Sequence, residues 1–141
     1  MDDPVEPMVW TTEELHEFRP LEERWTERAK FSIRVPKLVR GWAGFVIAVE
    51  GGYGGNLMIE EYWNDLDTRL LLQEALDALP EETAGRLWQA VEPWDRGFRA
   101  ASVETEPALW SGGWWASRVP ANPVPDFAEE VRQRLASRRQ S

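Results

Sequence analysis

Carboxylates are the most abundant reactive side chains of this chain, and their densest run lies between residues 60 and 74. The run contains Glu60, Glu61, Asp65, Asp67 and Glu74. Paired carboxylates can bind Mg²⁺ or act as a general acid and base. However, no His, Lys or Tyr accompanies them at a recognised spacing, and Asp65-Leu66-Asp67 lacks the glycine and the later Glu of a calcium-binding loop. We therefore interpret the run as helix caps and an exposed acidic face, and we predict no metal site.

The other side chains that could take part in catalysis are few and isolated. The one histidine, His16, stands between acidic residues, whereas a catalytic base needs a positioned nucleophile and an orienting partner. The glycine-rich stretch 51–55 lacks the Lys-Ser/Thr pair of a phosphate-binding loop. The absence of cysteine excludes disulfides, thiolate metal sites and cysteine nucleophiles. We therefore predict no catalytic residue and no cofactor, although enzymes that use only carboxylates keep catalysis open as an alternative.

Tryptophan is unusually frequent, with nine residues in a chain of 141. Trp114 and Trp115 are adjacent, so in a strand they point to opposite faces and one of them lies outside the main core. Arg118 follows these tryptophans closely in the sequence and could stack on one of their indole rings. A patch of indole rings and a guanidinium suits a planar or anionic group of a partner. We predict that Trp110, Trp114, Trp115 and Arg118 form a contact patch for a partner.

Two further sets of residues are candidates for binding. The acidic residues Glu60, Glu61, Asp65 and Asp67 could contact a basic partner. The second set would line a small-molecule pocket between a sheet and helices and contains Trp42, Trp63, Trp88 and Trp114.

The net charge of −9 selects among partners. Affinity for nucleic acid depends on basic side chains that contact phosphates, so nucleic-acid binding is disfavoured. Nucleic-acid binding remains a minor alternative because of a local basic run at Lys30, Arg34, Lys37 and Arg40. An acidic surface instead speeds association with a basic protein. We therefore expect the partner to be a protein with a basic surface.

The pattern of apolar residues predicts an α+β fold with an antiparallel sheet of three to four strands. The strands are expected at residues 31–35, 39–50, 57–63 and 110–119, and a glycine turn at 51–56 joins two of them. Helices are expected before, between and after the strands: from Thr11 or Thr12 to Lys30 with a break at Pro20, at 68–79, at 81–101 with a kink or a split at Pro93, and from Asp126. We expect a single domain over residues 1–141, with flexible ends at 1–10 and 136–141.

The remaining features concern the compartment. The acidic start of the chain is not typical of a secretory signal, and no apolar stretch approaches the roughly 20 residues of a membrane span. We therefore expect a cytoplasmic protein with no membrane contact. The many arginines and alanines relative to lysine are typical of a GC-rich genome, which indicates a bacterial source.

These features favour a protein-binding function. A small, acidic, cysteine-free chain of this kind could be an immunity- or antitoxin-type inhibitor of a basic partner. The alternatives are a small-molecule-binding or enzymatic domain with a tryptophan-lined pocket, and a subunit of a larger bacterial assembly.

Overall fold

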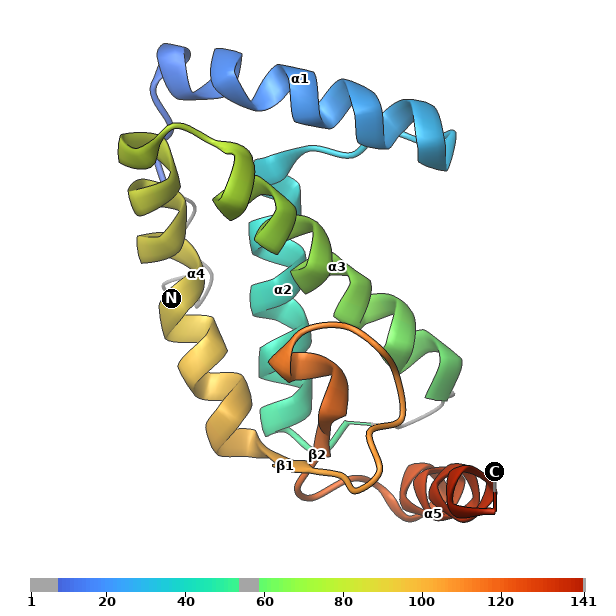
Figure 1. Cartoon of the computed structure of the whole chain (residues 1–141). Helices are drawn as coiled ribbons and strands as arrows, with labels where there is room; N and C mark the ends of the chain where they lie inside the picture. Colours follow the sequence, from blue (N-terminus) through green and yellow to red (C-terminus); the bar gives the residue numbers. More distant parts are fainter. Residues whose placement is uncertain (1–7, 54–58, 141) are drawn as a thin grey trace.

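The chain is built mainly from helices, as Figure 1 shows. This computed structural model describes residues 8–53 and 59–140. In chain order, its elements are α1 (Thr12–Ala29), α2 (Val35–Glu50), α3 (Ile59–Ala78), α4 (Glu81–Ala101), β1 (Ser102–Glu104), the 3-10 helix η1 (Trp114–Ser117), β2 (Arg118–Pro120) and α5 (Pro125–Arg139). The two short strands pair antiparallel, with Val103 opposite Val119.

The predicted α+β fold with three to four strands is wrong, because the described residues form five helices and only one two-stranded sheet. The largest error concerns residues 39–50, which lie in α2. Trp42, Val46 and Val49 are buried there at helical spacing, and Pro36 occupies the first turn, where a proline fits a helix. The β-branched and aromatic residues of this segment suggested a strand. In a short apolar run, however, periodicity does not separate a buried strand from a buried helix.

The other predicted strands also lie mostly elsewhere. Residues 31–34 form the connector between α1 and α2, and residues 59–63 begin α3, while residues 57 and 58 fall outside the described residues. Within 110–119, only Arg118 and Val119 belong to a strand. The chain turns before this strand, since Gly112 has a φ of +148° and a Cβ on Gly113 would lie 2.3 Å from the Trp115 ring.

Several predicted helices are confirmed. Helix α4 has the expected bounds of 81–101 and contains Pro93 without being split. Thr11 caps α1 through a reciprocal capping box with Glu14. The predicted break at Pro20 is wrong, because α1 continues through this exposed residue. The glycine turn that begins at Gly51 follows a helix rather than a strand.

Residues 136–139, which we expected to be flexible, form the last turn of α5. Arg138 and Arg139 there donate hydrogen bonds to the carbonyl oxygens of Leu109 and Glu106. Most of the predicted flexible N-terminus (residues 1–7), and residue 141, lie outside the described residues.

The core centres on aromatic side chains from α2 and its neighbours. The centre of the Phe45 ring lies 5.3–5.7 Å from the ring centres of Trp42, Tyr53, Tyr62 and Phe98. All five side chains are buried. Each buried aromatic side chain removes roughly 150–250 Å² from water, so this cluster is a main source of stability.

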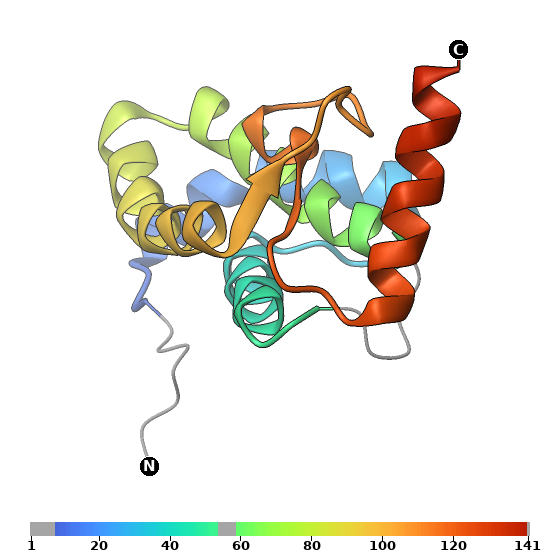
Figure 2. The same cartoon turned by 90° about the horizontal axis from the view of Figure 1, so that it is seen from below.

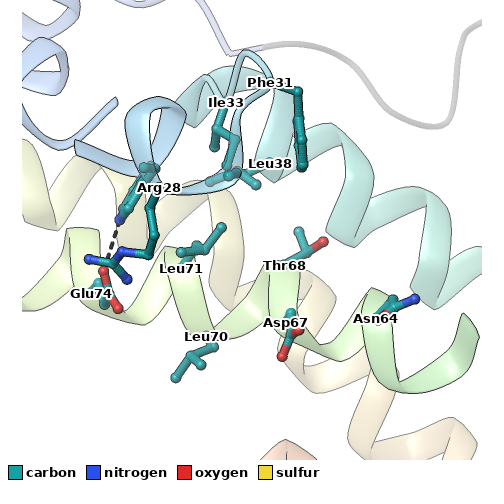
Figure 3. Close-up of a pocket in the computed structure, with 12 residues that line it drawn as sticks. Arg28, Phe31, Ile33, Leu38, Asn64, Asp67, Thr68, Leu70, Leu71 and Glu74 are labelled. Carbon is teal, nitrogen blue, oxygen red and sulfur yellow. Dashed lines mark hydrogen bonds between the residues drawn. The ribbon is translucent and has the colours of Figure 1, made fainter. Parts of the chain in front are cut away.

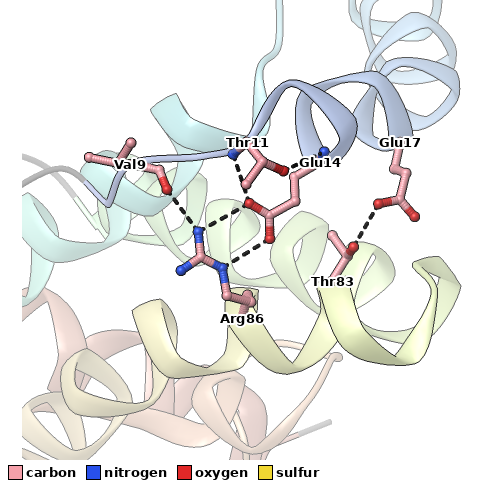
Figure 4. Close-up of polar contacts among 6 residues, drawn as sticks. All are labelled: Val9, Thr11, Glu14, Glu17, Thr83 and Arg86. Carbon is pink, nitrogen blue, oxygen red and sulfur yellow. Dashed lines mark hydrogen bonds and ion pairs between the residues drawn. The ribbon is translucent and has the colours of Figure 1, made fainter.

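Helix α1 is fixed to α4 by a polar clasp (Figure 4). The Arg86 guanidinium donates to both carboxylate oxygens of Glu14, at 3.0 and 3.1 Å, and to the Val9 carbonyl at 2.7 Å. The Thr11 backbone amide donates to the same carboxylate. These hydrogen bonds, chiefly those from Arg86, lower the pKa of Glu14 to about 2. The start of α1 is therefore held in place by charge-assisted hydrogen bonds.

Helix α2 packs against both α3 and α4. Figure 1 shows α1 lying across one end of these three helices and α5 at the other end. In the view from below, α5 stands along the edge of the molecule, and the segment before it crosses over the helices (Figure 2). Among the described residues, no helix combines the length and apolar character needed to cross a membrane.

Candidate functional site

The predicted tryptophan patch is folded onto the core. Trp115 is 4% exposed, and the Arg69 guanidinium carbon lies 4.7 Å from the centre of its ring. Trp110 is half-buried against Tyr62, with their ring centres 5.5 Å apart. Trp114 is also half-buried and packs edge-on against Trp115. Most of this aromatic surface is thus used within the chain.

Arg118 is likewise engaged by its own chain. Its guanidinium donates to the Ser102 hydroxyl at 2.8 Å and to the carbonyl oxygens of Arg99 and Ser102. The cation that stacks on Trp114 is Arg99, whose guanidinium carbon lies 3.8 Å from the ring centre. Arg118 therefore joins the end of α4 to β2.

The predicted acidic residues of α3 have different environments. Glu60 forms an ion pair with Arg134 of α5 at 2.7 Å, and Glu61 is exposed. Asp65 accepts a hydrogen bond from the Tyr53 hydroxyl at 2.9 Å, and burial raises the pKa of its carboxyl group. Asp67 lies in a surface groove, and burial also raises its pKa. Of these four residues, Asp67 is the one placed to meet a ligand in that groove.

The predicted pocket tryptophans, including Trp114, do not line the groove that contains Asp67. Trp42 is fully buried, and its indole N–H donates to Asp95 at 2.9 Å. Trp63 and Trp88 are 44% and 43% exposed, on α3 and α4 respectively.

Asp95 and Arg69 form a buried ion pair between α4 and α3. The Arg69 guanidinium donates two hydrogen bonds of 2.9 Å to the Asp95 carboxylate and a third to Gln73, and both charged side chains are at most 2% exposed. Together with the Trp42 indole, the pair joins α2, α3 and α4. Because its hydrogen bonds are satisfied and it is closed to solvent, it fits a structural role.

A groove of about 640 Å³ lies between α1 and α3, and we call it the α1–α3 groove (Figure 3). It is lined by Trp25, Arg28 and Ala29 of α1, Phe31 and Ile33 of the connector, Leu38 of α2, and the face of α3 between residues 64 and 74. Its apolar side chains include Phe31 and Leu70, which are 66% and 41% exposed. Exposed apolar side chains that gather in one groove are typical of binding sites.

Polar groups are placed along the α3 side of the groove. The Glu74 carboxylate accepts a hydrogen bond of 2.8 Å from the indole N–H of Trp25, and both residues line the groove (Figure 3). Among the described residues, none forms a hydrogen bond or ion pair with the carboxylate of Asp67. Arg28 is the one cationic side chain in the lining. The groove thus offers apolar walls and two carboxylates, of which Asp67 is free to meet a cation.

The desolvation of Asp67 leads to a prediction about stability. Because its folded-state pKa is raised, the ionised carboxylate disfavours the folded state above the ordinary Asp pKa of about 4. We expect Asp67→Asn to raise the urea midpoint of unfolding at pH 7. The gain should shrink as the pH falls through the raised pKa towards about 4, and it should be lost below that pH, where the wild-type carboxyl is protonated in both states. A midpoint that is unchanged or lower at pH 7 would contradict this account of Asp67.

The ionisable side chains of the groove are two carboxylates and one guanidinium. The groove contains no histidine or serine, and no group of three or more metal-binding side chains occurs in residues 8–53 and 59–140. Comparison with protein-family models, curated proteins and solved structures finds no match. The function is therefore inferred from the groove itself.

The sequence analysis did not single out Phe31, Leu38, Leu70 or Leu71, which form the apolar part of the groove. They come from three separate segments, so no spacing along the chain connects them. One signal was present for α3. In a helix, three consecutive leucines at 70–72 spread over more than half of its circumference, so they cannot all face one core. Leu72 is fully buried, while Leu70 faces outward.

Proposed function

We propose that this chain is a protein-binding protein that captures a basic partner through the α1–α3 groove. The observation that supports the proposal most directly is the combination of exposed Phe31 and Leu70 with the carboxylates of Asp67 and Glu74 in one groove. Apolar anchors surrounded by charged groups are the usual composition of a protein-recognition site. An immunity- or antitoxin-type inhibitor in the bacterial cytoplasm is the biological form of this function that we propose.

The charge of the surrounding helices supports a basic partner. Helix α3 contains six acidic residues and one basic residue, Arg69, whose charge is neutralised internally by Asp95. Helix α1 contains six acidic and three basic residues. A binding site that lies between two acidic helices attracts a cationic partner and repels an acidic one.

A small molecule is the second candidate ligand. The groove volume of about 640 Å³ is within the range of small-molecule sites, roughly 300–1,000 Å³. The same apolar and acidic groups would select a cationic amphiphile. A protein partner is favoured because Phe31 and Leu70 remain substantially exposed at an open surface, whereas a small-molecule site buries most of its ligand.

A pair of matched variants tests the protein-binding function. Leu70 in the groove and Ile47 on α2 are isomeric side chains with similar exposure, 41% and 37%, and Ile47 does not line the groove. We expect Leu70→Asp to reduce recovery of the partner at least tenfold, because it places a charge against the partner's apolar anchor. Ile47→Asp should leave recovery unchanged.

The measurement is purification of the tagged chain from its source organism at low salt, with quantitative mass spectrometry of the co-purifying proteins. Low salt matters because the Debye length falls to about 8 Å at physiological ionic strength. Circular dichroism of both variants controls for folding. Equal recovery of one basic protein by both variants would place the binding surface outside the groove. A bound small molecule, with no protein, would instead favour the second candidate.

A further inference from the structure

We propose that the partner segment that enters the α1–α3 groove is an amphipathic helix with basic side chains along one edge. This inference rests on the proposed function and specifies the structural class of the partner. It follows from what the groove offers to a peptide backbone, from the spacing of its apolar side chains and from the placement of its carboxylates.

The first step concerns backbone hydrogen bonds. The walls of the groove are mainly the helices α1 and α3, whose backbone groups are bonded within each helix. In the connector, the amide of Ile33 donates to the Thr26 hydroxyl at 3.0 Å, so it is also occupied. An extended peptide would therefore meet mainly side chains rather than a strand edge, and most of its own amides would face apolar walls unpaired. A helix avoids this cost because its backbone is bonded internally.

The second step concerns length and spacing. The lining face of α3 runs from residue 64 to residue 74, which corresponds to about 15 Å, or nearly three helical turns. Leu70 and Leu71 lie on this face, and Phe31 and Leu38 approach it from the other side (Figure 3). Trp63, 44% exposed, lies one turn before Asp67 and lengthens the exposed ridge. A ridge of this kind accommodates a partner helix whose apolar residues recur at i, i+3 or i+4, and i+7.

The third step concerns charge. Asp67 and Glu74 are seven residues apart on α3, so they lie on the same side of the helix and about 10 Å apart along its axis. A partner helix packed along α3 would meet both carboxylates with Lys or Arg residues that are also two turns apart. The long stems of these residues cover apolar surface while their charged ends reach the carboxylates.

Three synthetic peptides test the inference. Each is about 15 residues long, or ~22 Å as a helix. The first contains Leu at i, i+3, i+4 and i+7 with Lys on the flanks, the second is a shuffled sequence of the same composition, and the third has Glu in place of every Lys. Binding to the full chain is measured by the anisotropy of a dye on each peptide. We expect the first peptide to bind at about micromolar concentration, the shuffled peptide at least tenfold more weakly, and the Glu peptide more weakly still.

The variants locate the interaction. With the first peptide, Leu70→Asp should weaken binding at least tenfold and Ile47→Asp should not. Equal binding of the shuffled and amphipathic peptides would overturn the helical partner but leave the proposed capture of a basic protein intact. Equal binding of the Glu peptide would overturn the basic character of the partner, and with it the proposed function. Failure of all three peptides to bind at about 1 mM, where the free energy of binding is only ~4 kcal/mol, would contradict the helix-binding groove.

Discussion

Replacing Asp95 by alanine (Asp95→Ala) is expected to lower the free energy of unfolding by about 3–5 kcal/mol. The substitution leaves the Arg69 guanidinium, which is 1% exposed, buried without its counter-ion. It also removes the acceptor of the Trp42 indole N–H. Small domains are stable by only about 5–15 kcal/mol, so this variant should be largely unfolded in moderate urea or on mild heating. Urea unfolding followed by circular dichroism measures the loss.

Glu92→Ala is the matched control, because Glu92 lies one turn away on α4 and also pairs with an arginine. That arginine, Arg96, is 71% exposed, and a pair screened by solvent contributes at most about 1 kcal/mol. If Asp95→Ala and Glu92→Ala lowered the urea midpoint equally, the buried pair would not be the polar centre of the fold.

A second large effect is expected at Phe98. Its side chain is fully buried and contacts the rings of Trp42, Phe45 and Trp114. Phe98→Ala removes these contacts and leaves a cavity, which should cost about 3–5 kcal/mol of unfolding free energy. Thermal and urea unfolding would both report this loss.

Phe31→Ala is the matched control for Phe98→Ala, because it makes the same substitution in the groove instead of the core. Phe31 is 66% exposed, so the free energy of unfolding should change by at most about 0.5 kcal/mol. Partner binding, however, should weaken, because Phe31 is one wall of the α1–α3 groove. A large loss of stability in Phe31→Ala, or a small one in Phe98→Ala, would mean that core and groove are wrongly assigned.

The sequence predicted the helices with clear boundary signals. Thr11, the acidic first turn of α4 and the apolar stripe of α4 each act locally, so they could be recognised in isolation. The central helix could not be recognised in the same way. Val39 and Val49 favour a strand by intrinsic preference, but the packing of α2 between α3 and α4 determines the result. The strand predicted at 57–63 depends on pairing with 39–50, and its described part begins α3 instead.

The candidate site was predictable only in part. Asp67 was among the predicted partner-binding residues, and the structure places it in the groove. Trp115 and Arg118 attracted attention through residue type alone, but Trp115 packs in the core and Arg118 bonds within its own chain. Phe31 and Leu70 are common residue types, and their importance follows from exposure at one place, which depends on how α1 and α3 pack.

The most direct test of the account is a map of the binding surface by NMR. The ¹⁵N-labelled chain is titrated with the basic amphipathic peptide or with the co-purified partner. We predict that the backbone shifts change most around residues 28–38 and 64–74, together with the indole signal of Trp25, which bonds to Glu74 in the groove. Shift changes centred on residues 110–118, with residues 64–74 unaffected, would contradict the assignment of the α1–α3 groove as the binding site.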